Sequence, residues 1–183
     1  MSTPLRFTPL EGIPWVETGD DLARLLDDAA RRTGLALRDG VLLVCQKVVS
    51  RAEGRMVQLS DVAPSARARQ IAAEDGRDAR QVEVVLRETR RLVRRGHGVL
   101  ICETHHGFVC ANAGVDLSNA PKDDVAVLLP EDPDASARRL RAGLAARGHA
   151  PLGVVVTDTF GRPWREGLVD VALGCAGLAP VED

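Results

Sequence analysis

Apolar side chains recur with a helical period in several stretches of the chain, and each such stretch predicts an amphipathic helix. The expected helices cover residues 20–32, 64–74, 78–95 and 132–147. In the first, Leu22 and Leu25 fall on one face, and Asp20 is the expected N-cap. The last begins with Asp132 and Pro133, an acidic cap followed by a proline that the first helical turn tolerates.

Short apolar and β-branched runs between these helices predict strands. They cover residues 41–50, 99–103, 107–111, 125–129, 153–157 and 168–173. The pair His105-His106 separates two of them and is expected to form a tight turn between antiparallel strands, with a metal-binding pair as the alternative. The pattern therefore predicts an α+β fold, a mixed sheet with flanking helices, in a single domain over residues 1–183.

The predicted helix over residues 78–95 ends in a cluster of arginines: Arg90, Arg91, Arg94 and Arg95. Positive charge is favourable near the C-terminus of a helix. Two interpretations of the cluster stay open, a solvated face and an anion-binding patch.

Composition excludes several classes of function. Lys plus Arg is 24 and Asp plus Glu is 26, so a formal net charge of −2 disfavours a dedicated nucleic-acid binder. No apolar run approaches the roughly 20 residues that a membrane-spanning helix needs. The first ten residues lack the apolar core of a secretory signal, so no membrane contact and a cytoplasmic location are expected.

The cysteines form no C-x-x-C pair, and each lies in an apolar stretch; they are Cys45, Cys102, Cys110 and Cys175. Buried, reduced core thiols are the expected state, with a catalytic thiol or metal ligand as the alternative. Generic phosphate-binding, nucleophile-elbow and zinc motifs are absent from the sequence. Candidate chemistry must therefore come from other polar clusters.

Two strands run into polar residues that suit a ligand. Asp116 and Asn119 follow one strand after several small residues, and Asp158 and Thr159 end another. Carboxylate and hydroxyl oxygens are the ligands that Mg²⁺ and Mn²⁺ prefer. Turns in which these side chains hydrogen-bond their own backbone are the alternative.

Basic residues gather at two strand ends. Arg162 and Arg165 follow the second polar strand end. Gln46 and Lys47 interrupt the first predicted strand, and Arg51 follows it. Such side chains could hold phosphates, with arginine the better bidentate partner. Solvent-facing basic residues are the alternative at both places.

Taken in order, five segments resemble the coenzyme F420:γ-glutamyl ligase family. They read LEGIPWVETGDDL, VSRAEGR, GFVCANAGVDLSN, LLPEDPDASARRLR and VVVTDTFGRPWREGLVDVALG. The resemblance extends over essentially all 183 residues. It implies the α+β fold of that family.

The resemblance also implies an activity. Members of the family are GTP-dependent ligases that add L-glutamate to the coenzyme F420 precursor, F420-0, through an acyl phosphate, giving γ-glutamylated F420, GDP and phosphate. The implied ions are Mn²⁺ or Mg²⁺, with K⁺ as a further candidate. A homodimer is the implied assembly.

The same resemblance implies roles for individual residues. Asp116 and Asp158 are the implied catalytic residues and metal ligands, and Thr159 is a further metal ligand. The implied nucleotide-binding residues are Ile13, Pro14, Trp15, Val16, Gln46, Lys47, Arg51 and Asn119. Arg162 and Arg165 are hypothesised to contact phosphate or a carboxylate of F420.

Family chains continue for several dozen residues beyond the last matching segment, so a C-terminally truncated form is expected. Its missing segment could be supplied as a separate chain. Two alternatives to the ligase stay open: a non-catalytic domain that binds GTP or F420, and a metal-dependent phosphohydrolase that uses the same aspartates on water. An open site would expose an acyl phosphate to hydrolysis.

Overall fold

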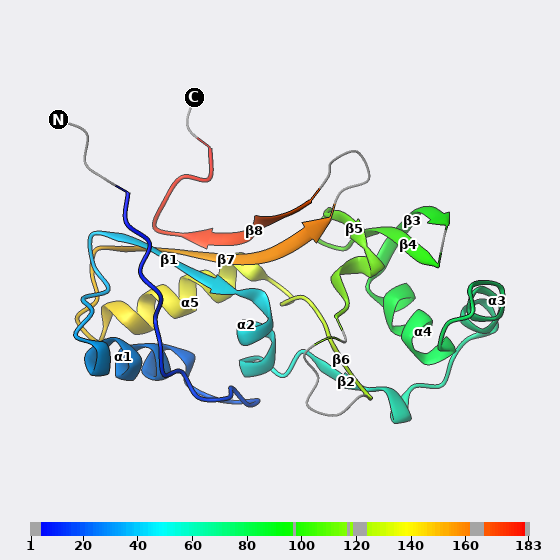
Figure 1. Cartoon of the computed structure of the whole chain (residues 1–183), viewed down its shortest axis with the longest axis horizontal. Coiled ribbons are helices and arrows are strands. Elements are labelled where there is room, and N and C mark those ends of the chain that lie inside the picture. The colour runs from blue at the N-terminus through cyan, green and yellow to red at the C-terminus, as the bar shows by residue number, and fades with distance from the viewer. Residues whose placement is uncertain (1–4, 97, 117, 119–123, 162–166, 182–183) are drawn as a thin grey trace.

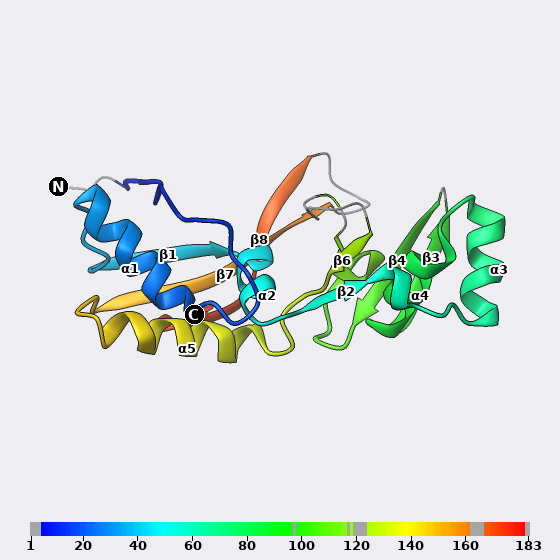
Figure 2. The same ribbon diagram turned by 90° about the horizontal axis from the view of Figure 1, so that it is seen from below.

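A computed structural model describes residues 5–96, 98–116, 118, 124–161 and 167–181. The molecule is elongated, with two parts that lie end to end along its long axis (Figures 1 and 2). Within the described residues, five α-helices and eight strands in three sheets make up the fold. The predicted α+β class is confirmed.

The first part is built on a mixed sheet. In spatial order its strands are β1 (Gly40–Cys45), β7 (Leu152–Gly161) and β8 (Leu168–Ala176). β1 runs parallel to β7, and β8 runs antiparallel to it. One face is covered by helices α1 (Leu22–Thr33) and α5 (Pro133–Ala145), and the short helix α2 (Gln46–Ala52) follows β1 (Figures 1 and 2).

The core of this part lies between the sheet and the two helices. Leu26 of α1, Leu144 of α5 and Val154 of β7 are buried in one apolar cluster. The two helices approach so closely that a Cβ atom at Gly143 would lie 2.7 Å from the methyl group of Ala23. Glycine in the last turn of α5 is therefore a requirement of helix packing, despite its low helix propensity.

The second part holds an antiparallel sheet and two helices. Its sheet consists of β3 (Thr89–Gly96), β4 (Val99–Thr104) and β5 (Val109–Ala111), with α3 (Ala66–Asp75) and α4 (Ala79–Arg87) beside it. A two-stranded ribbon and two 3₁₀ turns complete it: β2 (Met56–Gln58), β6 (Val125–Val127), η1 (Leu59–Asp61) and η2 (Asn112–Gly114). His105 and His106 occupy the turn between β4 and β5, as predicted.

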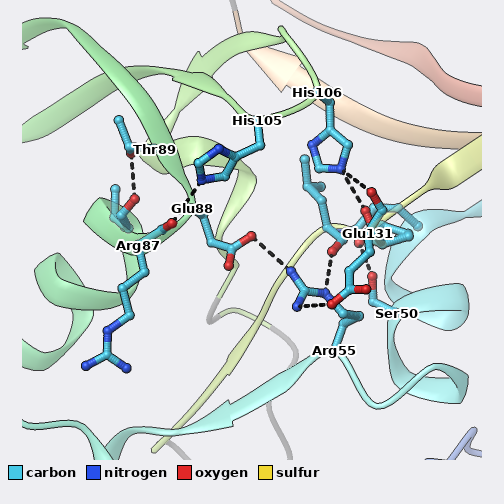
Figure 3. Close-up of polar contacts among 12 residues, drawn as sticks. Ser50, Arg55, Arg87, Glu88, Thr89, His105, His106 and Glu131 are labelled. Atoms are coloured by element: carbon cyan, nitrogen blue, oxygen red, sulfur yellow. Dashed lines mark hydrogen bonds and ion pairs between the residues drawn. The ribbon is translucent and has the colours of Figure 1, made fainter.

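Arg55 joins segments of both parts (Figure 3). Its guanidinium donates to the carbonyl of Leu129 at 3.0 Å and to the carboxylate of Glu88 at 3.0 Å. A third contact, to Glu131, measures 3.4 Å. His106 adds a hydrogen bond from the β4–β5 turn to the carbonyl of Glu131, with Nε2 and the oxygen 3.0 Å apart. The segment that leads into α5 is thereby fixed to β2 and to the second sheet.

The predicted helix over residues 78–95 is wrong in its second half. The structure ends α4 at Arg87, and residues 89–96 form β3. The hydroxyl of Thr89 donates to the carbonyl of Val85 and satisfies the end of the helix. Pairing with β4 then overrides the apolar period.

The arginine cluster therefore lies on a strand, where acidic side chains neutralise most of it. The contacts join Arg90 and Arg91 to Glu103, and Arg95 to Glu74 and Asp75. This arrangement supports the interpretation of a solvated face.

The predicted strand over residues 41–50 is also wrong beyond Cys45. Gln46 begins α2, and the hydroxyl of Ser50 donates to its side-chain oxygen at 2.8 Å, an i, i+4 contact typical of a helix. The N-cap of α1 is Asp21 rather than Asp20, whereas Asp132 caps α5 as predicted. The other predicted elements are present with shifts of a few residues at their ends.

The cysteines differ from the expectation in burial. Cys102 and Cys110 are buried, but Cys45 is exposed and Cys175 is partly exposed. All of them are free thiols. Within the described residues, no helix is long and apolar enough to cross a membrane.

Candidate functional site

Lys47 and Asp116, far apart in sequence, meet at the junction of the two parts. Lys47 lies in the first turn of α2, and Asp116 follows η2. The Lys47 Nζ atom is 2.5 Å from Asp116 Oδ2, and the backbone N–H of Ser118 donates to Asp116 Oδ1 at 2.7 Å. Burial raises the pKa of Asp116, but the hydrogen bonds from Lys47 and Ser118 outweigh it and hold that pKa below its usual value.

Asp158 is the second carboxylate of the site, and its environment has the opposite effect. Burial raises the pKa of Asp158, and the negative charges of Asp116 and Asp170 raise it further. The backbone N–H of Thr159 and the ammonium of Lys47 act in the opposite direction. Asp116 and Asp158 thus lie close enough to repel each other, and a divalent cation between them would offset that repulsion.

Thr159 points away from this carboxylate pair. Successive residues of a strand face opposite sides of the sheet, and Thr159 is paired across β7 and β8 with Asp170. The hydroxyl of Thr159 donates to Asp170 Oδ1 at 2.5 Å. The lone pairs of that hydroxyl oxygen stay available, but the structure does not place it beside Asp116.

Trp15 and Arg51, both predicted to bind nucleotide, are in contact. The Arg51 guanidinium carbon lies 4.0 Å from the centroid of the Trp15 ring, a cation–π contact. Arg51 lies one helical turn after Lys47 on α2, so both side chains lie on the same face of that helix. Trp15 is 57% exposed, while the neighbouring Val16 is buried in the core and anchors the segment.

The remaining predicted nucleotide-binding residues are less accessible or lie elsewhere. Ile13 packs partly buried against the core, and Pro14 is exposed beside it. The side chain of Gln46 is fully buried and faces Ser50, so it does not line an open surface. Asn119 lies outside the described residues.

Arg162 and Arg165 also lie outside the described residues. Of the cysteines, the buried Cys110 lies near the site, where burial, Cys102 and Asp158 together raise the pKa of its thiol to about 12. A thiol with so high a pKa stays protonated at neutral pH and is a poor nucleophile. The prediction of an unreactive Cys110 agrees with this environment.

The carboxylates of Asp116 and Asp158 are oxygen ligands of the kind that hard divalent cations prefer. The two carboxylates repel each other. Among the described charges that act on Asp158, Lys47 is the positive one, and Asp116 and Asp170 are negative. Within the described part of the chain, no three His, Cys, Asp or Glu side chains converge as a metal site by themselves. An ion at the pair would therefore need further oxygens from substrate, water or other residues.

Comparison with known proteins assigns the chain to a family. The sequence profile of the F420-0:gamma-glutamyl ligase family matches residues 12–183. The chain belongs to this family. It is 44% identical over 175 residues to the coenzyme F420:L-glutamate ligase of Methanothermobacter thermautotrophicus, covering 95% of this chain and 69% of that protein. For the same enzyme of Methanopyrus kandleri the identity is 46% over 180 residues, covering 98% and 69%.

Sequence reasoning about this member of the F420-0:gamma-glutamyl ligase family missed one group of polar residues. Arg77, Gln81 and Asn112 line a hollow that reaches Asp116 and Ser118. Arg77 and Gln81 lie in a segment predicted only as a helix and its approach, where nothing in the sequence distinguishes them from surface residues. Asn112 lies in the small-residue stretch before Asp116, the one signal that pointed to this place.

Proposed function

We propose that this chain joins L-glutamate to F420-0 in a GTP-dependent reaction that gives γ-glutamylated F420, GDP and phosphate. Membership in the ligase family, and relatives named coenzyme F420:L-glutamate ligase, support the substrates. The observation in the chain itself that carries the proposal is the meeting of Lys47, Asp116 and Asp158 at one place between the two parts.

The proposed chemistry has two transfers. In the first, a carboxylate oxygen of the acceptor attacks the γ-phosphorus of GTP, the bond to the bridging oxygen breaks, and GDP leaves. In the second, the glutamate nitrogen attacks the acyl carbon, the bond to the phosphate oxygen breaks, and the amine loses a proton. Such phosphoryl transfer depends on positioned charge and needs no nucleophilic side chain, which agrees with the protonated Cys110 thiol.

A divalent ion, Mn²⁺ or Mg²⁺, forms part of the proposal. Asp116 and Asp158 would hold it, and bound there it would supply positive charge to phosphate oxygens. Thr159, on the other side of β7, is proposed as an oxygen ligand of a separate ion. K⁺ stays a further candidate ion to which no residue is assigned.

The nucleotide is proposed to lie beside α2, next to Lys47 and the exposed ring of Trp15. Lys47 and Arg51 place positive charge one helical turn apart, with the Arg51 side chain buried against that ring. Ile13, Pro14 and Val16 belong to the segment that carries Trp15, and Ile13 and Val16 pack it against the core. Gln46 stabilises α2 by accepting a hydrogen bond from Ser50. Asn119, Arg162 and Arg165 stay candidates for nucleotide or substrate contacts.

A homodimer is also proposed, with a second copy covering the open face of the β1–β7–β8 sheet. Val41 and Leu43 on β1 are each 56% exposed, and Leu168 on β8 is 73% exposed. Apolar side chains gathered on an exposed face are typical of interfaces. Light scattering is expected to give a dimer mass for the native chain and a monomer mass for Leu43→Glu. Val93→Glu, which alters an exposed apolar residue on β3 of the other sheet, is the control and should keep the dimer mass. A monomeric native chain would contradict the proposal.

A ligation assay tests the proposed activity. The chain is incubated with F420-0, L-glutamate, GTP and Mn²⁺, and the products are weighed by mass spectrometry. A parallel arm adds, as a separate polypeptide, the part of the Methanothermobacter thermautotrophicus relative that this chain does not match. A product heavier by glutamyl groups supports the proposal, and a product only in the second arm shows that the separate segment completes the site.

Two other outcomes identify the alternative functions. GTP and Mn²⁺ binding without product in either arm would indicate a non-catalytic binding domain. Phosphate release that does not depend on glutamate would indicate a phosphohydrolase. Omitting GTP or Mn²⁺ is the control in each arm, because the proposed activation of the acceptor requires both.

A further inference from the structure

A polar hollow of about 330 Å³ lies beside Asp116, on the side of α4 and η2. Its polar lining comprises Arg77, Gln81, Asn112, Asp116 and Ser118. The two walls are fixed to each other, because Val85 of α4 and Ala113 of η2 pack in one apolar cluster. The hollow therefore extends the site away from α2, where the nucleotide is proposed to lie.

Arg77 is the cationic side chain of this hollow. Its Nη1 donates to Asn112 Oδ1 at 3.1 Å, and its backbone N–H bonds to the carbonyl of Ala72 at the end of α3. Within the described residues no carboxylate forms an ion pair with Arg77, although Arg80 and Arg95 each contact two. A guanidinium with a neutral partner keeps donors for a carboxylate ligand.

Asn112, the partner of Arg77, is held in a strained backbone conformation. Asn112 and Ala113 both adopt left-handed conformations, with φ of 51° and 52°. Strain of this kind persists only where the surroundings impose it, and it gathers at ligand sites. Here Gly114 packs so closely that a Cβ atom would lie 2.8 Å from Leu129, which fixes the turn that carries Asn112.

We infer that this hollow receives the amino-acid substrate of the proposed ligation, L-glutamate, with Arg77 paired to one of its carboxylates. The inference rests on the proposed function. Arg77 and Asp116 both line the hollow. With one carboxylate of the amino acid paired to Arg77, its amine would face the Asp116 end, where the acyl phosphate is proposed to form. The volume suits an amino acid and is small for a deazaflavin acceptor.

The test replaces Arg77 in the full chain. Binding of L-glutamate to the native chain, Arg77→Gln and Arg77→Lys is measured by calorimetry with Mn²⁺ and a non-hydrolysable GTP analogue, and KM is measured for each substrate. Loss of a charge-assisted pair predicts roughly 10- to 100-fold weaker glutamate binding and a similar rise in its KM for Arg77→Gln. Arg77→Lys is expected to recover part of the loss, and the KM for GTP and for F420-0 should change less than about twofold.

Arg67→Gln is the matched control, because Arg67 is an exposed arginine on the neighbouring helix α3. It should bind glutamate like the native chain. If urea unfolding shows that Arg77→Gln is unstable, Gln81→Leu replaces it as the test. This variant changes another residue of the lining and should also weaken glutamate binding.

The possible results separate the inference from the proposed function. Unchanged glutamate binding in Arg77→Gln, a raised KM for F420-0 in place of glutamate, or no glutamate binding by a native chain that binds nucleotide would each overturn the inference. Absence of ligation would overturn the proposed function. Even without ligation, glutamate binding by the native chain that is lost in Arg77→Gln would support the inferred glutamate site, because calorimetry requires no turnover.

Discussion

Asp116 and Asp158 carry the same functional group in opposite environments. Hydrogen bonds from Lys47 and Ser118 lower the pKa of Asp116, whereas burial and neighbouring carboxylates raise the pKa of Asp158. Pairs of titratable groups with pKa values pushed in opposite directions are typical of functional sites. The ionised form of Asp158 is therefore unfavourable for folding, and we expect function to be the reason for its presence.

Asp158→Asn is expected to lower kcat about 100-fold or more, because it removes charge that positions the reacting groups. The same substitution should not destabilise the fold. Because folding raises the pKa of Asp158, the native chain loses stability as pH rises from the unfolded toward the folded pKa. Without metal, the variant should be at least as stable as the native chain at pH 7, with the difference vanishing below about pH 4.

Urea unfolding in EDTA and the ligation assay measure the two effects of Asp158→Asn. Asp61→Asn is the control, since Asp61 is an exposed carboxylate on η1, and it should change neither quantity. A destabilised Asp158→Asn at pH 7 would show that this carboxylate has a structural role instead.

Trp15→Ala is expected to weaken the binding of GTP. The exposed ring positions the guanidinium of Arg51 through a cation–π contact within the chain, and loss of this positioning should lower GTP affinity by at least about twofold. Phe7→Ala removes another exposed aromatic ring near the N-terminus and serves as the control. Equal GTP affinity in calorimetry for both variants would separate Trp15 from the nucleotide site.

At the scale of elements, a strong local signal predicted the start of α5, whereas apolar runs alone did not separate helix from strand. Asp132 and Pro133 mark the start of α5 in sequence and in structure. The run that includes residues 46–50 gives no such signal, because a short buried helix and a buried strand have the same apolar pattern. Residues 89–96 became a strand through pairing with β4, a contact that no local pattern contains.

The same reasoning explains what could be predicted of the site. Asp116 and Asp158 follow strands and stand out as carboxylates after apolar runs, and the structure brings them into one environment. Arg77 and Gln81 reach the hollow only through the packing of α4 on η2. Their place depends on contacts between segments distant in sequence, and the sequence alone does not show it.

Asp27 connects α1 to the segment after α5, and its removal tests this link. His149 Nε2 is 2.8 Å from Asp27 Oδ1, and this hydrogen bond, with that of Arg31, lowers the pKa of Asp27. A lowered pKa stabilises the fold above the unfolded value and loses that effect as pH falls. Asp27→Asn should therefore lower the urea midpoint at pH 7, with the difference from the native chain shrinking below about pH 4.

Asp28→Asn is the matched control for this prediction, since Asp28 is the next residue and forms a 3.6 Å pair with Arg24 at the surface. Such exposed pairs contribute little to stability. A loss at pH 7 that persists unchanged at pH 3 would mean that Asp27 acts through packing and not through its charge.

At the scale of the whole molecule, the site depends on the relative position of the two parts. Lys47 belongs to α2 of the first part, whereas Asp116 follows η2 of the second. Arg55 spans this junction through its contacts with Glu88, Leu129 and Glu131 (Figure 3). Arg55 should thus stabilise both the fold and the distance between the two halves of the site.

Arg55→Met is expected to destabilise the chain by about 1–3 kcal/mol, because it leaves the partly buried Glu88 and the carbonyl of Leu129 without their donor. Urea unfolding followed by circular dichroism measures this loss. Arg138→Met removes an arginine whose only ion pair within the described residues is a surface contact of 3.6 Å, and its effect should stay within about 0.5 kcal/mol. Equal losses for the two variants would mean that Arg55 contributes no more than a surface arginine, and that other contacts, such as the Lys47–Asp116 pair, hold the two parts together.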